Sequence, residues 1–195
     1  VSFYNQTGDV AILPTPVIGI LGVIDDVRKA IPYKFVGEKE LILLGETFEE
    51  FSGGEWAALQ GHLGGIPPQV NLQGEMALAR FMEAQRDYIA AAHDLSDGGL
   101  VVALIEMLLH SETGAKISLH GDPFTQLFSE SSGRVLLAVN PEDSNYLVGK
   151  ATEAGITSTR LGKSGGENFE IAGVLSLSML HLREANSRTI PALFS

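Results

Sequence analysis

The stretch Ile89–Leu109 constrains the fold more than any other part of the sequence. A short run able to form a strand, Ile89–Ala92, is followed by the polar turn His93–Gly99 and then by Leu100–Leu109, which is apolar nearly all round when wound into a helix. A helix without a polar face has to be covered on every side. The stretch therefore predicts a deeply buried helix that follows directly on a strand and a glycine turn.

From Ile31 onward, runs typical of strands alternate with runs typical of helices, which indicates an α+β fold with a mixed sheet covered by helices. The expected strands are Glu40–Leu44, Ile89–Ala92, Ala115–Leu119, Arg134–Val139, Ile156–Leu161 and Phe169–Val174. The expected helices are Trp56–Leu59, Asn71–Tyr88, Leu100–Leu109, Pro123–Phe128, Asn140–Gly155 and Leu175–Glu184, with a loose tail at Ser187–Ser195.

Two of these helices carry specific expectations. Asn71 can cap the first turn of its helix, and Leu72, Met76, Ala79 and Met82 would form the buried face. Asn140 and Pro141 are typical of a cap followed by the first helical position.

Residues 1–30 differ from the rest of the chain. Val1–Tyr4 alternates like a strand, and Val17–Ile24 is an uninterrupted apolar run that predicts a buried strand. The charged run Asp25–Lys29 marks an expected boundary, so we expect one domain piece over 1–30 and a second domain over 31–195. Because the sequence begins inside an expected strand, we expect it to be a piece of a longer protein.

Composition excludes several classes of protein. Asp and Glu number 24 and Lys and Arg 13, which gives a net charge of −11 and argues against nucleic acid as the main partner. The chain has no cysteine, so disulfide scaffolds, cysteine-ligated metals and a thiol nucleophile are excluded. No apolar run approaches the roughly 20 residues needed to span a bilayer, so we expect no membrane segment.

Residues 38–55 contain six acidic side chains, which we expect on a solvated face (Glu38, Glu40, Glu46, Glu49, Glu50 and Glu55).

The first candidate site is the turn before the buried helix, with Asp94, Ser96, Asp97, Gly98 and Gly99. Its free amides and glycines could receive a phosphate, with Mg²⁺ bridging to the aspartates. In the alternative, Ser96 or Asp97 caps the helix and the turn is structural.

The second candidate site is the loop Leu127–Arg134, where Glu130, Ser131 and Ser132 precede a buried strand. These side chains could hold a hydroxyl or carboxylate ligand. The alternative is a structural turn in which Arg134 pairs with Glu130.

Taken together, these two motifs resemble the C-terminal half of phosphoribosylformylglycinamidine synthases of the small, bacterial type. The matching segments are His-Asp-Leu-Ser-Asp-Gly-Gly-Leu from His93 and Leu-Phe-Ser-Glu-Ser-Ser-Gly-Arg-Val-Leu from Leu127. Four further segments agree in the same order, Val1–Asn5, Leu13–Pro16, Val23–Asp26 and Leu43–Thr47. The resemblance covers essentially the whole chain.

The resemblance implies a layered α/β/α domain of the aminoimidazole ribonucleotide synthetase C-terminal type over 31–195, preceded at 1–30 by the end of the second N-terminal-type domain. It implies an ATP- and Mg²⁺-dependent, cytoplasmic amidoligase of purine biosynthesis that acts on formylglycinamide ribonucleotide. A glutaminase subunit would supply ammonia, and a small accessory subunit and the missing N-terminal half of the chain would complete the enzyme. We expect no catalysis from the fragment alone.

The resemblance also assigns individual residues. Ser2 matches the substrate-binding serine of a Gly-Asn-Val-Ser segment, whose first two residues would lie upstream. Glu130, Ser131 and Ser132 are the pseudo-symmetric counterpart of a substrate-binding Glu-Ser-Gln triplet, from which Ser132 departs. The catalytic histidine of the family belongs to the other half, and His93 does not match it.

Two alternatives stay open. The chain could come from a related enzyme, namely aminoimidazole ribonucleotide synthetase, thiamine monophosphate kinase or selenophosphate synthetase. It could instead be a dimerisation module without catalytic activity.

Overall fold

The computed structural model describes residues 6–11 and 17–193, with the side chains of 189–191 and 193 left out. The chain divides into two compact units, Val1–Ala30 and Ile31–Ser195. Ser2, one of the candidate site residues, lies outside the described residues, as does the expected strand Val1–Tyr4.

The second unit is built on a mixed sheet of seven strands in the order β4-β6-β3-β7-β5-β8-β9. Neighbouring strands are antiparallel except β5 and β8, which are parallel. The strands in chain order are β3 (Glu40–Leu44), β4 (Ala91–Asp94), β5 (Ala115–Ile117), β6 (Val135–Val139), β7 (Ser158–Ser164), β8 (Asn168–Ile171) and β9 (Leu175–Ser178). The expected mixed sheet is thus confirmed.

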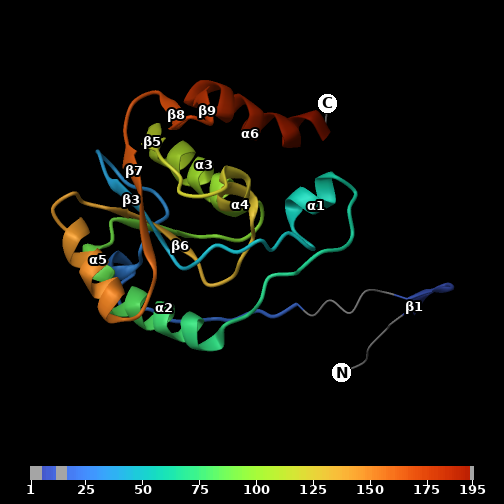
Figure 1. The fold of residues 1–195 in the computed structure, drawn as a ribbon, viewed down its shortest axis with the longest axis horizontal. Coiled ribbons are helices and arrows are strands. Elements are labelled where there is room, and N and C mark those ends of the chain that lie inside the picture. The colour runs from blue at the N-terminus through green and yellow to red at the C-terminus, as the bar shows by residue number, and fades with distance from the viewer. Residues whose placement is uncertain (1–5, 12–16, 194–195) are drawn as a thin grey trace. The chain divides into compact units, whose positions relative to one another are not determined.

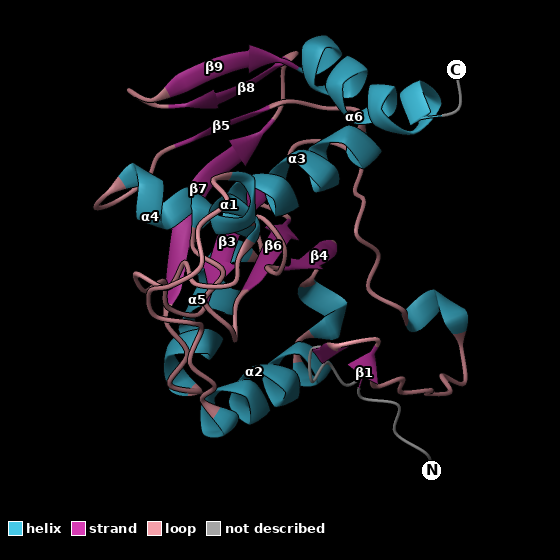
Figure 2. Ribbon diagram, turned by 90° about the vertical axis from the view of Figure 1, so that its right-hand side faces the viewer, coloured by secondary structure: helices cyan, strands magenta, loops and turns pink. Residues whose placement is uncertain are grey.

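Helices cover both faces of this sheet (Figures 1 and 2). They are α1 (Glu55–Leu59), α2 (Leu72–Ala84), α3 (Gly99–Ser111), α4 (Pro123–Phe128), α5 (Ser144–Glu153) and α6 (Met179–Leu193), with a 3-10 turn at Arg86–Tyr88.

Strand β3 shows why the structure is layered. Leu41 and Leu43 belong to the core formed with α3, whereas Ile42 and Leu44 belong to the core formed with α2 and α5. Because successive side chains of a strand point to opposite faces, both faces of β3 are buried and need a helical layer. Helix α3 is deeply buried, with Leu100, Leu104, Met107 and Leu108 fully enclosed, but the expected cover on every side was wrong, because Val102, Glu106 and His110 form an exposed stripe. The α/β/α layering is therefore confirmed.

Three local predictions were wrong. Leu175–Ser178, expected to begin a helix, forms strand β9, because its leucines and serines alternate and the segment pairs with β8. Helix α6 then runs from Met179 to Leu193, through the tail that was expected to be loose. Helix α5 begins at Ser144, because the amide of Asp143 donates to the Asn140 carbonyl (3.0 Å) and makes a turn there. Helix α2 buries Leu78 and Phe81, whereas Leu72 and Met76 are exposed.

The first unit contains a short hairpin, β1 (Gln6–Thr7) and β2 (Val10–Ala11), and a 3-10 turn at Val27–Lys29. The prediction of a buried strand at Val17–Ile24 was wrong for this chain, because the segment forms no strand and its large side chains are exposed. Across the described residues, none of the helices combines the length and the apolar character that a bilayer crossing requires.

The cap of α2 gives a test of this fold. The Asn71 side chain accepts the amide of Gly74 at 3.1 Å, as the sequence predicts. Replacing Asn71 by Ala should lower the free energy of unfolding by about 1 kcal/mol, whereas Asn71→Asp should be nearly neutral. Urea unfolding of both variants measures the difference, and equal losses would contradict a capping role.

Candidate functional site

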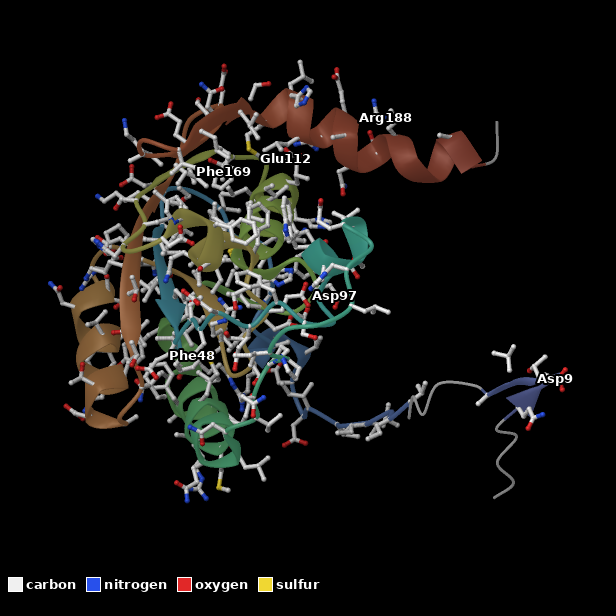
Figure 3. All side chains as sticks on the ribbon, turned by 45° about the vertical axis from the view of Figure 1, so that its right-hand side comes forward. Asp9, Phe48, Asp97, Glu112, Phe169 and Arg188 are labelled. Atoms are coloured by element: carbon white, nitrogen blue, oxygen red, sulfur yellow. The ribbon has the colours of Figure 1, made fainter. Side chains whose placement is uncertain are left out.

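The candidate residues gather at one end of the sheet. Leu44 at the end of β3 pairs with Val135 at the start of β6 and with Ser158 at the start of β7, and Asp94 at the end of β4 pairs with Val135 as well. The loops that continue from these strand ends therefore come together. In Figure 3, Asp97 marks the turn before α3 and Phe48 marks the loop after β3.

Glu130 joins the two candidate motifs. Its Oε1 atom accepts the amide of Gly98 at 2.9 Å and the amide of Glu55 at 2.7 Å. One carboxylate oxygen thus satisfies backbone donors at the start of both α3 and α1, where negative charge is favoured by the helix dipole. The motifs lie 32 positions apart in sequence at this contact.

The turn does not cap α3 with its own side chains. The N-cap is Gly98 in a left-handed conformation, and Ser96 contributes only its carbonyl, which accepts the amide of Gly99 at 3.0 Å. The predicted capping by Ser96 or Asp97 was wrong, because the carboxylate of Glu130 takes that role. The side chains of Asp94, Ser96 and Asp97 are exposed as a result.

Gly99 is required by the close approach of the two motifs. A Cβ atom on Gly99 would lie 2.5 Å from the carbonyl oxygen of Ser129 and 2.8 Å from that of Leu127, and its φ of +69° disfavours other residues. The turn can therefore rest directly on the backbone of the second loop.

Arg134 organises the second loop from inside. It is only 2% exposed, and its guanidinium donates to the carbonyls of Ser131 (2.8 Å) and Ser129 (2.6 Å) and to Thr47 Oγ1 (3.2 Å). The predicted pairing of Arg134 with Glu130 was wrong, since the three hydrogen bonds of Arg134 go to these acceptors instead. Burial lowers the pKa of Arg134 to about 10, and the negative charges of Glu50 and Glu130 oppose that shift, so the group is a cation at neutral pH.

Sequence reasoning missed Glu50, which was expected on a solvated face but is 5% exposed. Its Oε1 accepts the amide of Gln69 at 3.0 Å, and the carbonyl of Gln69 accepts the hydroxyl of Ser132 at 2.6 Å. Its Oε2 is buried and has no hydrogen-bond partner among the described residues. Nothing in the acidic run distinguishes Glu50 from its exposed neighbours.

A cavity of about 220 Å³ opens beside this network. Its polar lining comes from the residues just after β3 and just before β7, from the start of α2 and the segment before it, and from the second loop (Glu46, Thr157, Asn71, Glu75, Gln69 and Ser132). Neither Lys nor Arg lines it among the described residues, so the lining favours hydroxyl groups or cations over phosphate.

The arrangement does not form a metal or nucleotide-phosphate site by itself. Among the described residues there is no group of three or more His, Asp or Glu that could hold a metal ion. The amide of Gly98, which could bind a phosphate, already donates to Glu130. The residues present do not fit Mg²⁺–ATP on their own.

Comparison with known proteins decides the family. The profile of the family "AIR synthase related protein, C-terminal domain" matches residues 38–173. The chain belongs to this family.

Its curated relatives include the phosphoribosylformylglycinamidine synthase subunit PurL of Rhodococcus erythropolis. That subunit is 50% identical over 203 residues, which cover 100% of this chain and 27% of the relative. The PurL subunit of Thermobifida fusca is 48% identical over 202 residues, covering 100% of this chain and 26% of the relative. The chain thus spans about a quarter of the length of these relatives.

Several solved structures share the fold of this chain. Thermotoga maritima PurL complexed with FGAR has a TM-score of 0.69 at 17% identity, over 80% of this chain and 30% of that one. A HypE–HypF complex has a TM-score of 0.55 at 16% identity, over 76% of this chain and 54% of that one. The resemblance read from the sequence is therefore confirmed at the level of family and fold. The binding roles of Ser2, Asp94, Ser96, Asp97, Gly98, Gly99, Glu130, Ser131 and Ser132 stay predictions.

Glu130 is tested by two substitutions. Glu130→Ala leaves the amides of Gly98 and Glu55 without an acceptor and should lower the free energy of unfolding by about 1–3 kcal/mol. Glu130→Gln keeps an acceptor oxygen and should lower the free energy of unfolding clearly less than Glu130→Ala does. Chemical unfolding measures both, with Glu142→Ala, on an exposed acid, as the control for charge removal. A Glu130→Ala variant as stable as that control would contradict the bridging role.

Gly99 is tested against a glycine in open space. Gly99→Ala should destabilise the second unit by more than about 2 kcal/mol, because the backbone of Ser129 and Leu127 cannot give way as a flexible side chain could. Gly149→Ala, inside α5 with nothing within 4 Å, should instead be stabilising by roughly 0.5–1 kcal/mol. Thermal unfolding of the pair gives the comparison, and similar effects at both positions would contradict the close contact.

Proposed function

We propose that this chain is part of a phosphoribosylformylglycinamidine synthase, the ATP-dependent amidoligase of purine biosynthesis. The observation that carries the proposal is the 50% identity to the Rhodococcus erythropolis PurL subunit over the whole chain. The likeness in fold to Thermotoga maritima PurL supports it.

In the proposed reaction, formylglycinamide ribonucleotide, ATP and ammonia give formylglycinamidine ribonucleotide, ADP and phosphate. The terminal phosphoryl group of ATP would move to the amide oxygen of the substrate, and ammonia would then displace phosphate at that carbon. Activation of this kind depends on cations around the transferring phosphoryl group. Mg²⁺ and ATP are proposed for the complete enzyme, since the described residues do not fit them alone.

The proposed contribution of this chain is one wall of the reaction site. Residues 31–195 would be the second C-terminal-type domain and residues 1–30 the end of the second N-terminal-type domain. Ser2 would bind formylglycinamide ribonucleotide. The exposed side chains of Asp94, Ser96 and Asp97 and the cavity-lining Ser132 would face the rest of the enzyme.

Partners follow from the same proposal. The chain has no cysteine, so a cysteine-dependent glutaminase activity would belong to a separate subunit that supplies ammonia. A structure of PurLQS from Thermotoga maritima has a TM-score of 0.63 to this chain, which is consistent with a complex of several subunits. We propose a small accessory subunit as a further partner and the cytoplasm as the location.

The function is tested with the complete polypeptide. With formylglycinamide ribonucleotide, ATP, Mg²⁺ and ammonium, it should form the amidine product and one ADP per product, whereas residues 1–195 alone should show no turnover. Ser2→Ala in the complete polypeptide should raise the dissociation constant for formylglycinamide ribonucleotide by about tenfold, the loss of one hydrogen bond to substrate.

Ser187→Ala, on the exposed surface of α6, is the matched control and should leave that constant unchanged. Turnover of formylglycinamidine ribonucleotide to an aminoimidazole, or of thiamine monophosphate or selenide, in place of formylglycinamide ribonucleotide would overturn the proposal. Unchanged affinity in Ser2→Ala would overturn the assignment of Ser2 alone.

A further inference from the structure

Residues 53–65 form a surface loop that is closed at its base. The amide of Ser52 donates to the carbonyl of Ile66 at 3.2 Å, so the chain leaves the second unit and returns to it at one point. Compact loops whose ends meet in this way are Ω-loops, which are frequently functional. Gly53 and Gly65 lie directly inside this neck, with φ of +79° and +96°. Because glycine changes its backbone dihedral angles at low cost, these two positions can act as hinges.

Residues 55–63, which we call the flap, have few attachments beyond these hinges. The flap carries helix α1 and the turn after it. Among the described residues, its hydrogen bonds lie within residues 54–62 except one, in which the amide of Glu55 donates to Oε1 of Glu130 at 2.7 Å. Every residue from 58 to 67 is exposed. A segment with so few buried contacts opens at a lower free-energy cost than the core does.

Trp56 is the large side chain that anchors the flap. Its ring lies against Phe124 and Phe128 of α4, with centroids 5.1 and 4.9 Å apart, and α1 accordingly lies beside α4 in Figure 1. Leu59 and Leu63, by contrast, are 77% and 95% exposed. The flap is thus held by one aromatic contact and one hydrogen bond to a carboxylate, both at its first turn.

The hydrogen bond that holds the flap shares its acceptor with the turn before α3. Oε1 of Glu130 accepts the amide of Gly98 at 2.9 Å as well as that of Glu55. The base of the flap covers the carboxylate, since a Cβ atom on Gly54 would lie 2.8 Å from Cδ of Glu130. When the flap moves away, Gly98 keeps its acceptor and α3 can stay in place. Oε1 then has one donor in place of two and can accept a hydrogen bond from water or from a ligand.

We propose that the flap is a lid that opens about Gly53 and Gly65 and is latched by Glu130 and Trp56. Opening uncovers the carboxylate of Glu130 beside the turn that precedes α3, and closing covers it again. This motion uses groups of the second unit alone and does not depend on the reaction proposed above.

Amide hydrogen exchange of the complete polypeptide tests the opening. The peptide 55–63 should exchange at least about a hundredfold faster than the α3 peptide Gly99–Ser111. Urea below the unfolding transition should leave the rate of the flap unchanged and raise that of α3, because a local opening exposes little surface. Equal rates with equal urea dependence would show that the flap opens only when the whole domain unfolds and would overturn the lid.

The carboxylate latch is tested by Glu130→Gln. Loss of the charged acceptor should raise the exchange rate of the flap about tenfold, with much smaller changes in α3 and in β3. Glu142→Gln, at an exposed acid, is the matched control and should leave all three rates unchanged. An unchanged flap, or an equal rise in all three peptides, would contradict a latch at Glu130.

The aromatic latch is tested by Phe124→Ala, which removes one ring from Trp56. The exchange rate of the flap should rise severalfold, while that of β3 stays the same. Tyr146→Ala is the matched control, because Tyr146 is 42% exposed against 38% for Phe124 and pairs with Tyr88 instead. It should not change the rate of the flap. Equal effects of the two variants on the flap would overturn the role of Trp56.

Discussion

One carboxylate oxygen of Glu130 accepts hydrogen bonds from backbone amides at the start of two helices. These two hydrogen bonds set the arrangement of the candidate site. An amide left without an acceptor at a half-buried helix start is unfavourable, and both α1 and α3 begin where their own residues offer no side-chain cap. Glu130 comes from a third segment, so its carboxylate ties three parts of the chain together. Because this link uses backbone donors, the side chains of Asp94, Ser96 and Asp97 in the turn before α3 stay exposed.

Two buried charges reinforce that arrangement without forming an ion pair with one another. Arg134 is held by two carbonyls and a hydroxyl, and Glu50 is held by one amide. Fixed partners offset the loss of hydration of Arg134, whereas the Oε2 atom of Glu50 has no hydrogen-bond partner among the described residues. Each therefore restrains the loop around it: Arg134 shapes the backbone of residues 129–134, and Glu50 fixes Gln69, which in turn orients Ser132 at the cavity.

The sequence predicts an element well where one hydrophobic periodicity dominates its residues. It predicts an element poorly where the structure depends on a contact with residues far away in the sequence. Helix α3 and the strands β3 and β6 follow from apolar runs with clear stops. The buried face of α2 depends on which side meets the sheet, and the strand β9 depends on pairing with β8, so neither follows from local pattern. The candidate site behaves in the same way. Its two motifs stand out locally, but the Glu130 bridge, the acceptors of Arg134 and the burial of Glu50 are contacts between segments far apart in sequence.

The charge of the site limits what this chain can do within the proposed reaction. A nucleotide substrate and ATP bring several negative charges, whereas the described cavity lining contains Glu46 and Glu75 and no cation, and the amide of Gly98 is already occupied. At neutral pH the buried Arg134 is a cation, but its side chain is 2% exposed and three of its five N–H donors are held by protein acceptors. Phosphate groups would therefore have to be neutralised by Mg²⁺ or by basic residues outside the described chain. The need for outside cations follows from the electrostatics of the cavity lining. It agrees with the finding that the chain spans about a quarter of its relatives' length. In the proposed enzyme, this chain would contribute exposed polar side chains to a shared site, and the anion-binding groups would come from elsewhere in the longer polypeptide.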